Sequence, residues 1–506
     1  MVQYGRGDTM AIRRGIIVII GLLLQILLFL FFYLYLAEHF LIISILFQVL
    51  GFLLTLCLIK YSRSYSYTLP WIIIILLFPL VGSLLFLIIG YNKKKSKLLK
   101  SIVKSESDNK KYLIQDKDIR KEINYNSSMR YITDYSNYPI TTNNDVDYYP
   151  LGELAFEEML KELKKAEKFI FFEYFIVKPG IIWNKILDRF KEKAKSGIEV
   201  RVMYDDLGCV GSLNKKYPEE LKKFGIKCIV FNRLSPLSGI IMNNRDHRKI
   251  LVIDGKVAFS GGINIADEYI NVDSRFGHWK DNGIKISGDA VWNYTVMFLT
   301  MWNSFEKVDE DFNKYKYKFT KNKTNKGYIA PYGESPLDDE LLGQNIYLNI
   351  INQANDYVYI CTPYLITDTD MINSLVLAAK RGVDVRIIIP GIPDKKLVYM
   401  LTESYVEPLV SHGVKVYRYT PGFIHGKVFV ADDKISTVGT INLDYRSLYL
   451  HFECGMYMEN VNCIKDIKKD MKETIEKSHE ITKKEARPNL FKSILQALLR
   501  LFAPLM

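Results

Sequence analysis

Three uncharged stretches dominate the first 92 residues of the chain. Residues 15–37 and 40–59 each reach the length of about 20 apolar residues that a helix needs to cross a bilayer. The third stretch, residues 71–91, contains Pro79 and Gly82; either it is a re-entrant or interfacial segment, or it is a third span and the N-terminus faces out. The pattern predicts a membrane module over residues 1–92 with two or three spans.

The pattern changes after this module. Residues 93–149 are rich in Lys, Asn, Ser and Tyr, and predict a linker. Beyond the linker, apolar strands alternate with helical segments, which is typical of a mixed α/β sheet with helices on both faces. We expect a first domain over residues 150–312 and a second over residues 327–482, joined by the Lys-rich linker 313–326.

The two predicted domains repeat one another. Three apolar strands in the first half, each after a helical segment, have counterparts in the second half. The matched segments are 166–176 with 354–366, 197–205 with 382–390, and 221–231 with 409–419. Two similar halves are expected to pack about a pseudo-twofold axis, which would bring equivalent positions into one cleft.

Residues 483–506 end the chain with a different pattern. The stretch is apolar from residue 488, but it is too short to span a membrane and contains Lys492 and Arg500. Its Leu, Ile and Phe residues predict an amphipathic helix. Such a helix either docks on the protein's own core or lies in a membrane surface.

The strongest match between the halves is polar. Residues 247–264 (HRKILVIDGKVAFSGGIN) align with residues 425–442 (HGKVFVADDKISTVGTIN). Each copy begins with His-x-Lys, places Asp seven residues after the His and places Asn seventeen residues after it. The two sets are His247, Lys249, Asp254 and Asn264, and His425, Lys427, Asp432 and Asn442. A four-point pattern that occurs twice in register predicts one shared catalytic site.

These residue types suit the cleavage of a phosphodiester without a metal. Residues two apart on a strand point the same way, so His-x-Lys places an imidazole and an ammonium group on one face. One histidine can attack phosphorus, the other can protonate the leaving alcohol, and the lysines can bind phosphoryl oxygens. Asn264 and Asn442 would donate hydrogen bonds to the phosphoryl group. We interpret the motif residues Asp254 and Asp432 as structural anchors rather than substrate contacts.

A nucleophilic histidine needs a carboxylate on its other ring nitrogen. Extending the repeat alignment sets residues 279–281 (WKD) against residues 451–453 (HFE). Asp281 and Glu453 are therefore predicted to orient the histidines, with Glu268 as the competing candidate in the first half.

The formal net charge of +12 favours anionic partners, namely nucleic acid, anionic membranes or phosphorylated substrates. The six cysteines form no CxxC pair, so we expect no metal site and no cofactor. A cluster of lysines directly follows the apolar module, where it would meet lipid headgroups rather than nucleic acid. The cluster comprises Lys93, Lys94, Lys95, Lys97 and Lys100.

The duplicated motif resembles the phospholipase D superfamily, over residues of about 140 to 480. The apolar module, SNYPITTNN (136–144) and GTINLDYRS (439–447) are similar to bacterial cardiolipin synthases in particular. Two positions depart from the family pattern. Gly426 stands where Ala or Ser is usual, and His451 stands where Asn is more usual. The resemblance implies two phospholipase D-like domains, with His247 as the nucleophile and His425 as the general acid and base.

The resemblance also implies a reaction. Two phosphatidylglycerol molecules would give cardiolipin and glycerol through a phosphatidyl-histidine intermediate. The alternatives are a hydrolytic phospholipase D or another phosphatidyltransferase of the superfamily. The apolar spans argue against a nuclease, and the intact double motif argues against an inactive scaffold.

The expected partners are phosphatidylglycerol and anionic membrane lipid, without nucleic acid; the oligomeric state stays open. Arg13 and Arg14 favour a cytoplasmic N-terminus, whereas the lysine cluster favours a cytoplasmic catalytic part. The lysine cluster contains more positive charges, so we give it more weight. We therefore expect a multi-pass protein of the cell membrane with cytoplasmic catalytic domains.

Overall fold

The computed structural model describes residues 23–28, 30–31, 37–61, 65–87, 97–234, 244–320 and 327–505. The chain forms two compact units. The first comprises Met1–Lys95 and Ala497–Met506, and the second comprises Ser96–Gln496.

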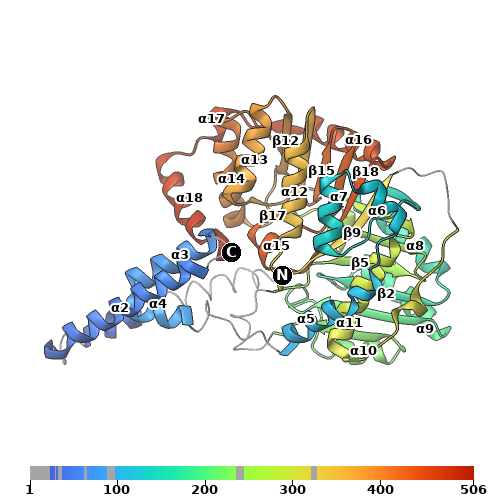
Figure 1. Ribbon diagram of the computed structural model, residues 1–506, viewed down its shortest axis with the longest axis horizontal. Helices are drawn as coiled ribbons and strands as arrows, with labels where there is room; N and C mark the ends of the chain where they lie inside the picture. Colours follow the sequence, from blue (N-terminus) through green and yellow to red (C-terminus); the bar gives the residue numbers. More distant parts are fainter. Residues whose placement is uncertain are drawn as a thin grey trace. The chain divides into compact units, whose positions relative to one another are not determined.

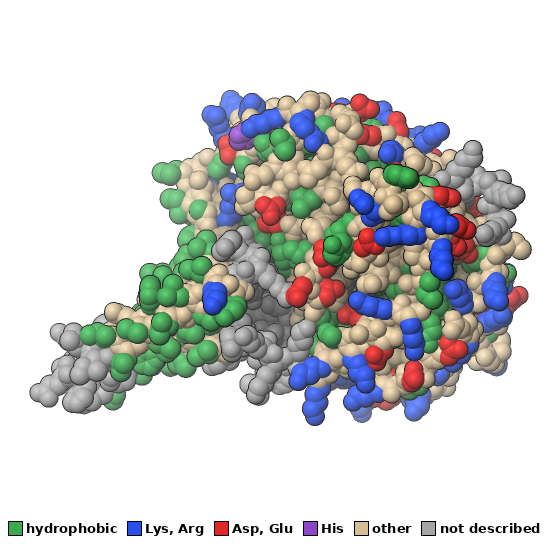
Figure 2. All heavy atoms as spheres, viewed as in Figure 1, with side chains coloured by type: hydrophobic (Ala, Val, Ile, Leu, Met, Phe, Trp, Pro, Cys, Tyr) green, Lys and Arg blue, Asp and Glu red, His purple; other side chains and the backbone are tan. Residues whose placement is uncertain are grey.

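The first unit is built from apolar helices, drawn in blue in Figure 1. They are α2 (Ala37–Tyr61), α3 (Tyr65–Leu77) and α4 (Pro79–Leu85). Within the described part of the chain, only α2 is long and apolar enough to cross a membrane, over Ser44–Tyr61. Figure 2 shows hydrophobic side chains gathered over this unit, and those of Leu46, Phe52 and Leu53 are exposed.

The predicted third stretch is divided between α3 and α4. Pro79 lacks the N–H of an interior helical residue and begins α4, after an N-cap residue, Phe78, with non-helical dihedral angles. A Cβ at Gly82 would lie 2.3 Å from the carbonyl oxygen of Ile74, so this turn requires glycine for its close approach to α3. The described residues contain one candidate span, and the predicted span 15–37 lies mostly outside them, so the multi-pass arrangement stays a prediction.

The second unit contains two mixed sheets. The order of the first is β1-β8-β6-β5-β2-β3-β4. Its strands are β1 (Asn144–Tyr149), β2 (Phe169–Tyr174), β3 (Glu199–Asp205), β4 (Lys227–Phe231), β5 (Lys249–Ile253), β6 (Val257–Gly261) and β8 (Gly283–Gly288). Strands β2, β3 and β4 are parallel, whereas β5, β6, β8 and β1 pair antiparallel.

The second sheet repeats this arrangement in the order β9-β18-β16-β15-β10-β12-β13, and adds β19 at the edge. Its strands are β9 (Tyr328–Glu334), β10 (Tyr357–Cys361), β12 (Asp384–Pro390), β13 (Lys415–Tyr419), β15 (Val428–Ala431), β16 (Ile435–Gly439), β18 (Glu453–Glu459) and β19 (Ser478–Glu480). Every matched pair of sequence segments therefore occupies equivalent strands. The prediction of two similar α/β repeats is confirmed.

The strands are apolar on both faces because both faces of each sheet are covered by other parts of the protein. Phe171 of β2 joins a core cluster that also holds Val428 and Val430 of β15, so the two sheets share one core. Ile170 and Phe172, which point to the opposite face of β2, pack with residues of α8 (Gly152–Lys165) and α9 (Ile181–Lys195). The motifs at the ends of β5 and β15 thus sit on a rigid double sheet.

The predicted linker 93–149 is replaced by helices over most of its length. They are α5 (Lys97–Asn109), α6 (Lys117–Ile123) and α7 (Ser127–Tyr131), followed by β1 in the first sheet. Ile102 of α5 is fully buried, and Ser101 Oγ donates to the carbonyl of Ser304 in α11 (Val291–Glu306) at 2.6 Å. The high lysine content concealed an amphipathic helix, and strand β1 of the first sheet lies within the segment predicted as a linker.

The predicted linker 313–326 is also partly packed. The 3₁₀ turn η5 (Phe312–Tyr315) buries both of its aromatic end residues. The hydroxyl of Tyr315 accepts from Arg201 of β3 at 2.7 Å, and Arg201 forms an ion pair with Glu310 at 2.8 Å. The last part of this segment, 321–326, lies outside the described residues.

Candidate active site

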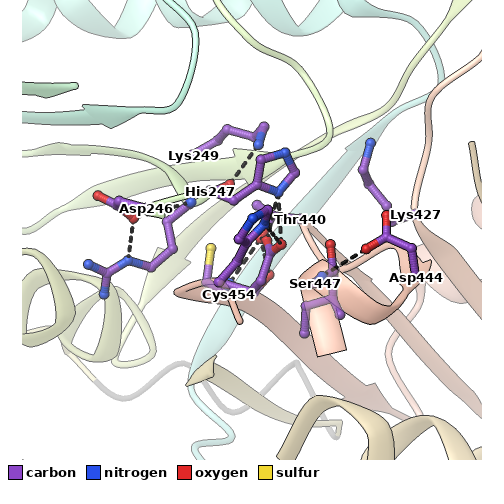
Figure 3. Close-up of polar contacts among 12 residues, drawn as sticks. Asp246, His247, Lys249, Lys427, Thr440, Asp444, Ser447 and Cys454 are labelled. Carbon is purple, nitrogen blue, oxygen red and sulfur yellow. Dashed lines mark hydrogen bonds and ion pairs between the residues drawn. The ribbon is translucent and has the colours of Figure 1, made fainter. Parts of the chain in front are cut away.

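The His-x-Lys segments lie at the starts of two equivalent strands. His247 directly precedes β5, which begins at Lys249, and His425 and Lys427 directly precede β15. All four side chains are buried. Lys249 Nζ donates to the carbonyl of its own histidine, His247, at 2.6 Å, and Lys427 Nζ donates to the carbonyl of His425. Figure 3 shows His247, Lys249 and Lys427 together between the two halves.

Each histidine is positioned by backbone from the other half. The N–H of His425 donates to the carbonyl of Lys280 at 2.7 Å, where β7 (His278–Lys280) runs parallel to β14 (Gly422–Ile424). The N–H of His247 donates to the carbonyl of Phe452 at 2.8 Å, beside a bridge between Asp246 and Phe452. Each half therefore contributes an equivalent backbone segment that positions the histidine of the other half.

The carboxylates follow these carbonyls and are exchanged in the same way. Asp281 Oδ2 lies 2.7 Å from Nδ1 of His425, and Glu453 Oε1 lies 2.9 Å from Nδ1 of His247. Burial by itself raises the pKa of both carboxyl groups. The charge and hydrogen bond of the paired histidine outweigh burial, so the pKa of each carboxyl group lies below its usual value. Both acids are therefore ionised acceptors for a ring N–H.

The competing carboxylate has another partner. Glu268 forms an ion pair with Lys178 at 2.5 Å. The structure therefore places Asp281, and not Glu268, on the histidine of the shared site. The sequence alignment alone could not reveal that the pairs cross between the halves.

The histidines and lysines have lowered pKa values. Burial lowers the pKa of His247 to about 3 and that of His425 to about 4, because a buried imidazolium loses its hydration. Burial likewise lowers the pKa of Lys249 to about 8 and that of Lys427 to about 7, the latter also through the positive charge of Lys249. A site with neutral imidazoles and two closely spaced amines suits an anionic phosphodiester, whose charge would favour the protonated lysines.

The motif aspartates lie away from this chemistry. Asp254 accepts hydrogen bonds from the backbone N–H groups of residues 167, 168 and 169 at 2.7–2.9 Å. Asp432 accepts from residues 355, 356 and 357 at 2.8–3.0 Å. Each aspartate thereby ties the turn after its motif strand to the segment that leads into the neighbouring strand, β2 or β10. These contacts are those of anchors.

The motif asparagines differ from each other. Asn264 Nδ2 donates to the hydroxyl of Tyr269 at 2.8 Å, and its Oδ1 accepts from the N–H of Ile176 at 3.1 Å. The side chain of Asn442 is buried, and its Oδ1 has no hydrogen-bond partner among the residues that the structure describes. Phosphate binding by either amide stays a prediction, and it would require Asn264 to exchange its tyrosine partner.

Sequence reasoning missed the residue that holds Glu453 from the far side. Thr440 Oγ1 donates to Glu453 Oε2. The equivalent residue in the first half is Gly262, where a Cβ would lie 2.0 Å from Oδ1 of Asp281. The difference between GGIN (261–264) and GTIN (439–442) could have revealed this contact. Gly262 leaves space beside Asp281, whereas Thr440 supplies a hydrogen-bond donor to Glu453.

Sequence reasoning also missed the rings that cover the histidines. Phe175 and His451 lie 4.9 Å and 5.6 Å from His247 between ring centroids. Tyr269 and Trp279 lie 5.3 Å and 5.5 Å from His425. These rings limit the access of water to both imidazoles, which strengthens electrostatic interactions at the site.

Comparison with known proteins shows the family to which this chain belongs. Residues 159–302 and 347–475 match the family described as "Cardiolipin synthase, PLD-like domain". A cardiolipin synthase of Clostridium perfringens (strain SM101 / Type A) is 36% identical over 462 residues, which cover 88% of this chain and 95% of that protein. The chain belongs to the cardiolipin synthase family. The matches support cardiolipin synthase function, and thus a phosphatidyltransferase.

Other similar proteins extend this comparison. An uncharacterised protein of Streptococcus mutans serotype c (strain ATCC 700610 / UA159) is 46% identical over 444 residues, covering 86% of this cardiolipin synthase family member and 96% of that protein. The solved structure of the phosphatidylserine synthase of Haemophilus influenzae Rd KW20 matches with a TM-score of 0.57 and 16% identity. That match covers 75% of this chain and 98% of the solved chain, and it shows that the fold is shared.

Proposed function

We propose that this enzyme transfers a phosphatidyl group from one phosphatidylglycerol to the hydroxyl of another, forming cardiolipin and releasing glycerol. The observation that carries the proposal is the pair of buried histidines, each held through Nδ1 by a carboxylate of the opposite half. A ring whose Nδ1–H donates to a carboxylate presents the lone pair of Nε2 to a substrate. Two such rings can divide nucleophilic and acid–base work between them.

The proposed reaction has two steps. In the first step, Nε2 of His247 attacks phosphorus, the bond from phosphorus to the glycerol oxygen breaks, and protonated His425 gives its proton to that oxygen. The negative phosphodiester favours the imidazolium form of His425, and Asp281 stabilises it. In the second step, neutral His425 takes the proton of the acceptor hydroxyl, whose oxygen displaces His247 from phosphorus. Lys249 and Lys427 would bind the phosphoryl oxygens in both steps.

The choice of acceptor is tested by the products. Purified full-length protein in phosphatidylglycerol vesicles should produce cardiolipin and glycerol in equal amounts, as measured by mass spectrometry. Because one phosphodiester replaces another, added glycerol should reduce net cardiolipin formation. Phosphatidic acid as the main product would instead establish a hydrolase, and a requirement for a nucleotide-activated donor would establish a different transferase.

Metal removal should leave the chemical step intact. The two lysines would carry the positive charge that a metal supplies in other phosphotransfer sites. We expect the initial rate with the chelator EDTA to equal the rate without it in mixed detergent micelles, where lipid aggregation does not depend on cations. A loss of turnover that Mg²⁺ restores under these conditions would contradict the proposed role of the lysines.

A membrane location is supported by α2 and by the lipid enzymes to which the chain is similar. The finer proposal of cytoplasmic catalytic domains depends on the lysines that follow the apolar module. Lys97 and Lys100 of that cluster lie at the start of α5, and the other three lie outside the described residues.

The C-terminal helix α18 (Leu490–Phe502) exposes apolar side chains. Lys492 Nζ forms an ion pair with Glu403 of α14 (Lys396–Ser411) at 2.9 Å, and Gln496 Nε2 donates to the carbonyl of Met400 at 3.3 Å. Its polar side therefore faces protein, while the side chains of Leu490 and Phe491 are each 80% exposed. This arrangement is the reverse of a helix docked on a core. We infer that the apolar side lies in the membrane surface.

Spin labelling tests the position of α18. In full-length protein with Cys57 replaced by Ser, a label on Phe491→Cys should gain oxygen accessibility and lose accessibility to an aqueous relaxing agent when the protein enters vesicles. A label on Lys483→Cys of the preceding helix, α17 (Lys483–Ala486), should stay aqueous. A label at residue 491 that remains aqueous in vesicles would rule out the interfacial position.

A further inference from the structure

A third histidine lies beside the first His-Lys pair. Nδ1 of His451 is 3.6 Å from Oε1 of Glu453, and the two rings of His451 and His247 are 5.6 Å apart. The side chain of His451 is 8% exposed, yet neither of its ring nitrogens has a hydrogen-bond partner within the described residues. A buried polar group without a partner costs free energy, so this imidazole is available for a ligand.

The surrounding groups match the requirements of a zinc ion. His247, His451 and Glu453 offer three ligand atoms that lie within 4.8 Å of one another. Oε1 of Glu453 is 2.9 Å from Nδ1 of His247 and 3.6 Å from Nδ1 of His451. Ligands on a tetrahedral zinc with bonds of about 2.0–2.1 Å lie about 3.3 Å apart, a separation between these two distances. We propose that these three residues form an inhibitory binding site for Zn²⁺.

The surroundings of the second motif histidine, His425, provide an internal comparison. Trp279 occupies the position equivalent to His451, two residues before the carboxylate Asp281. Its ring lies 5.5 Å from that of His425, so it covers the histidine in a similar way. An indole N–H can only donate and has no lone pair for a metal. Among the described residues, a zinc ion therefore finds three ligands around His247 but only two, His425 and Asp281, around the second motif histidine.

The expected inhibition rests on the proposed function. In the reactive form, Nδ1 of His247 carries the proton that it donates to Glu453, and Nε2 keeps a lone pair for phosphorus. Zinc bound to Nδ1 takes up the lone pair of that nitrogen, so the ring proton resides on Nε2. The histidine then cannot attack, and Glu453 is withdrawn from its orienting role. Because Lys249 and Lys427 repel a cation, we expect inhibition in the micromolar range of free zinc.

The first test measures binding without turnover. Full-length protein in detergent is titrated with ZnCl₂ against a chromogenic chelator, and the bound ion is examined by X-ray absorption. We expect one zinc per chain with two imidazole ligands, and at least about tenfold weaker binding in His451→Asn, because an amide oxygen is a poorer zinc ligand than imidazole. The exposed His479, paired with Glu485 at 2.8 Å, supplies the control variant His479→Asn, which should bind like the unchanged protein.

The second test measures the rate at buffered free zinc, each variant relative to its own zinc-free rate. We expect the half-inhibitory concentration to rise at least tenfold in His451→Asn and to stay unchanged in His479→Asn, with no inhibition by Mg²⁺. Equal zinc sensitivity of His451→Asn and the unchanged protein would overturn the site. If zinc binds through His451 but the protein makes no cardiolipin, the site stands and the proposed function fails.

Discussion

Alanine at either motif histidine is expected to reduce turnover by on the order of 10⁴-fold or more. His247→Ala removes the proposed nucleophile, and His425→Ala removes the group that protonates the departing glycerol oxygen. The two losses should be similar although the residues lie in different repeats, because each variant lacks one of the two groups that both steps of the reaction require. Initial rates of cardiolipin formation, measured on variants with unchanged thermal unfolding, give the comparison.

The covalent intermediate distinguishes the two histidines. After quenching in alkaline denaturant, which preserves a phosphorus–nitrogen bond, phosphatidylglycerol labelled in its acyl chains should leave label on residue 247 of the His425→Ala protein, provided that the incubation is long enough for slow glycerol release. Peptide mass spectrometry locates the modified ring. Label on residue 425 in the His247→Ala protein would reverse the assignment, and near-normal activity of either folded variant would refute a shared site.

The second large effect is expected at the carboxylates. Glu453→Gln keeps size and hydrogen-bonding capacity but removes the charge that holds Nδ1–H of His247 and its tautomer. By analogy with an Asp-to-Asn change in a Ser-His-Asp triad, the turnover number should fall by about 10³- to 10⁴-fold. Asp281→Asn should have an effect of similar size through His425.

The turnover number should carry this loss while the KM for phosphatidylglycerol changes little, because neither carboxylate is proposed to touch the lipid. Glu268→Gln is the matched control, since Glu268 pairs with the partly exposed Lys178 and should leave the rate within about twofold. Nitrogen-15 NMR of the imidazole rings reports the tautomer directly. An unchanged tautomer in a Glu453→Gln protein of normal activity would exclude the orienting role.

The sequence predicted the repeat and the motifs because both are local patterns. In each half the His-x-Lys pair, the strand that follows it, the next turn and the Asn all lie within one short segment, 247–264 or 425–442. The crossed pairs of His247 with Glu453 and His425 with Asp281 join residues 206 and 144 positions apart. Their pairing depends on how the two halves pack, which an alignment of one half with the other does not contain.

The segment between the membrane module and the sheets was misjudged for a different reason. Its composition, rich in Lys, Asn and Ser, is typical of a solvated linker and masks a short apolar periodicity. Leu98, Leu99 and Ile102 nevertheless place apolar side chains on one side of α5, where Ile102 is buried and the other two pack against the shared core. These three apolar residues, together with the hydrogen bond from Ser101 to Ser304, dock a helix whose composition is otherwise mostly polar.

The exchange of backbone between the halves has a consequence for how such an enzyme can be divided or regulated. The peptide groups of Lys280 and Phe452 hold the opposite histidines, so a chain cut between the repeats would leave each fragment without the backbone that positions its own reactive ring. Neither fragment could retain partial catalysis alone; activity would return only on reassociation, with second-order dependence on fragment concentration. Any partner that wedged the repeats apart by the length of one hydrogen bond would disable both rings simultaneously, without touching either.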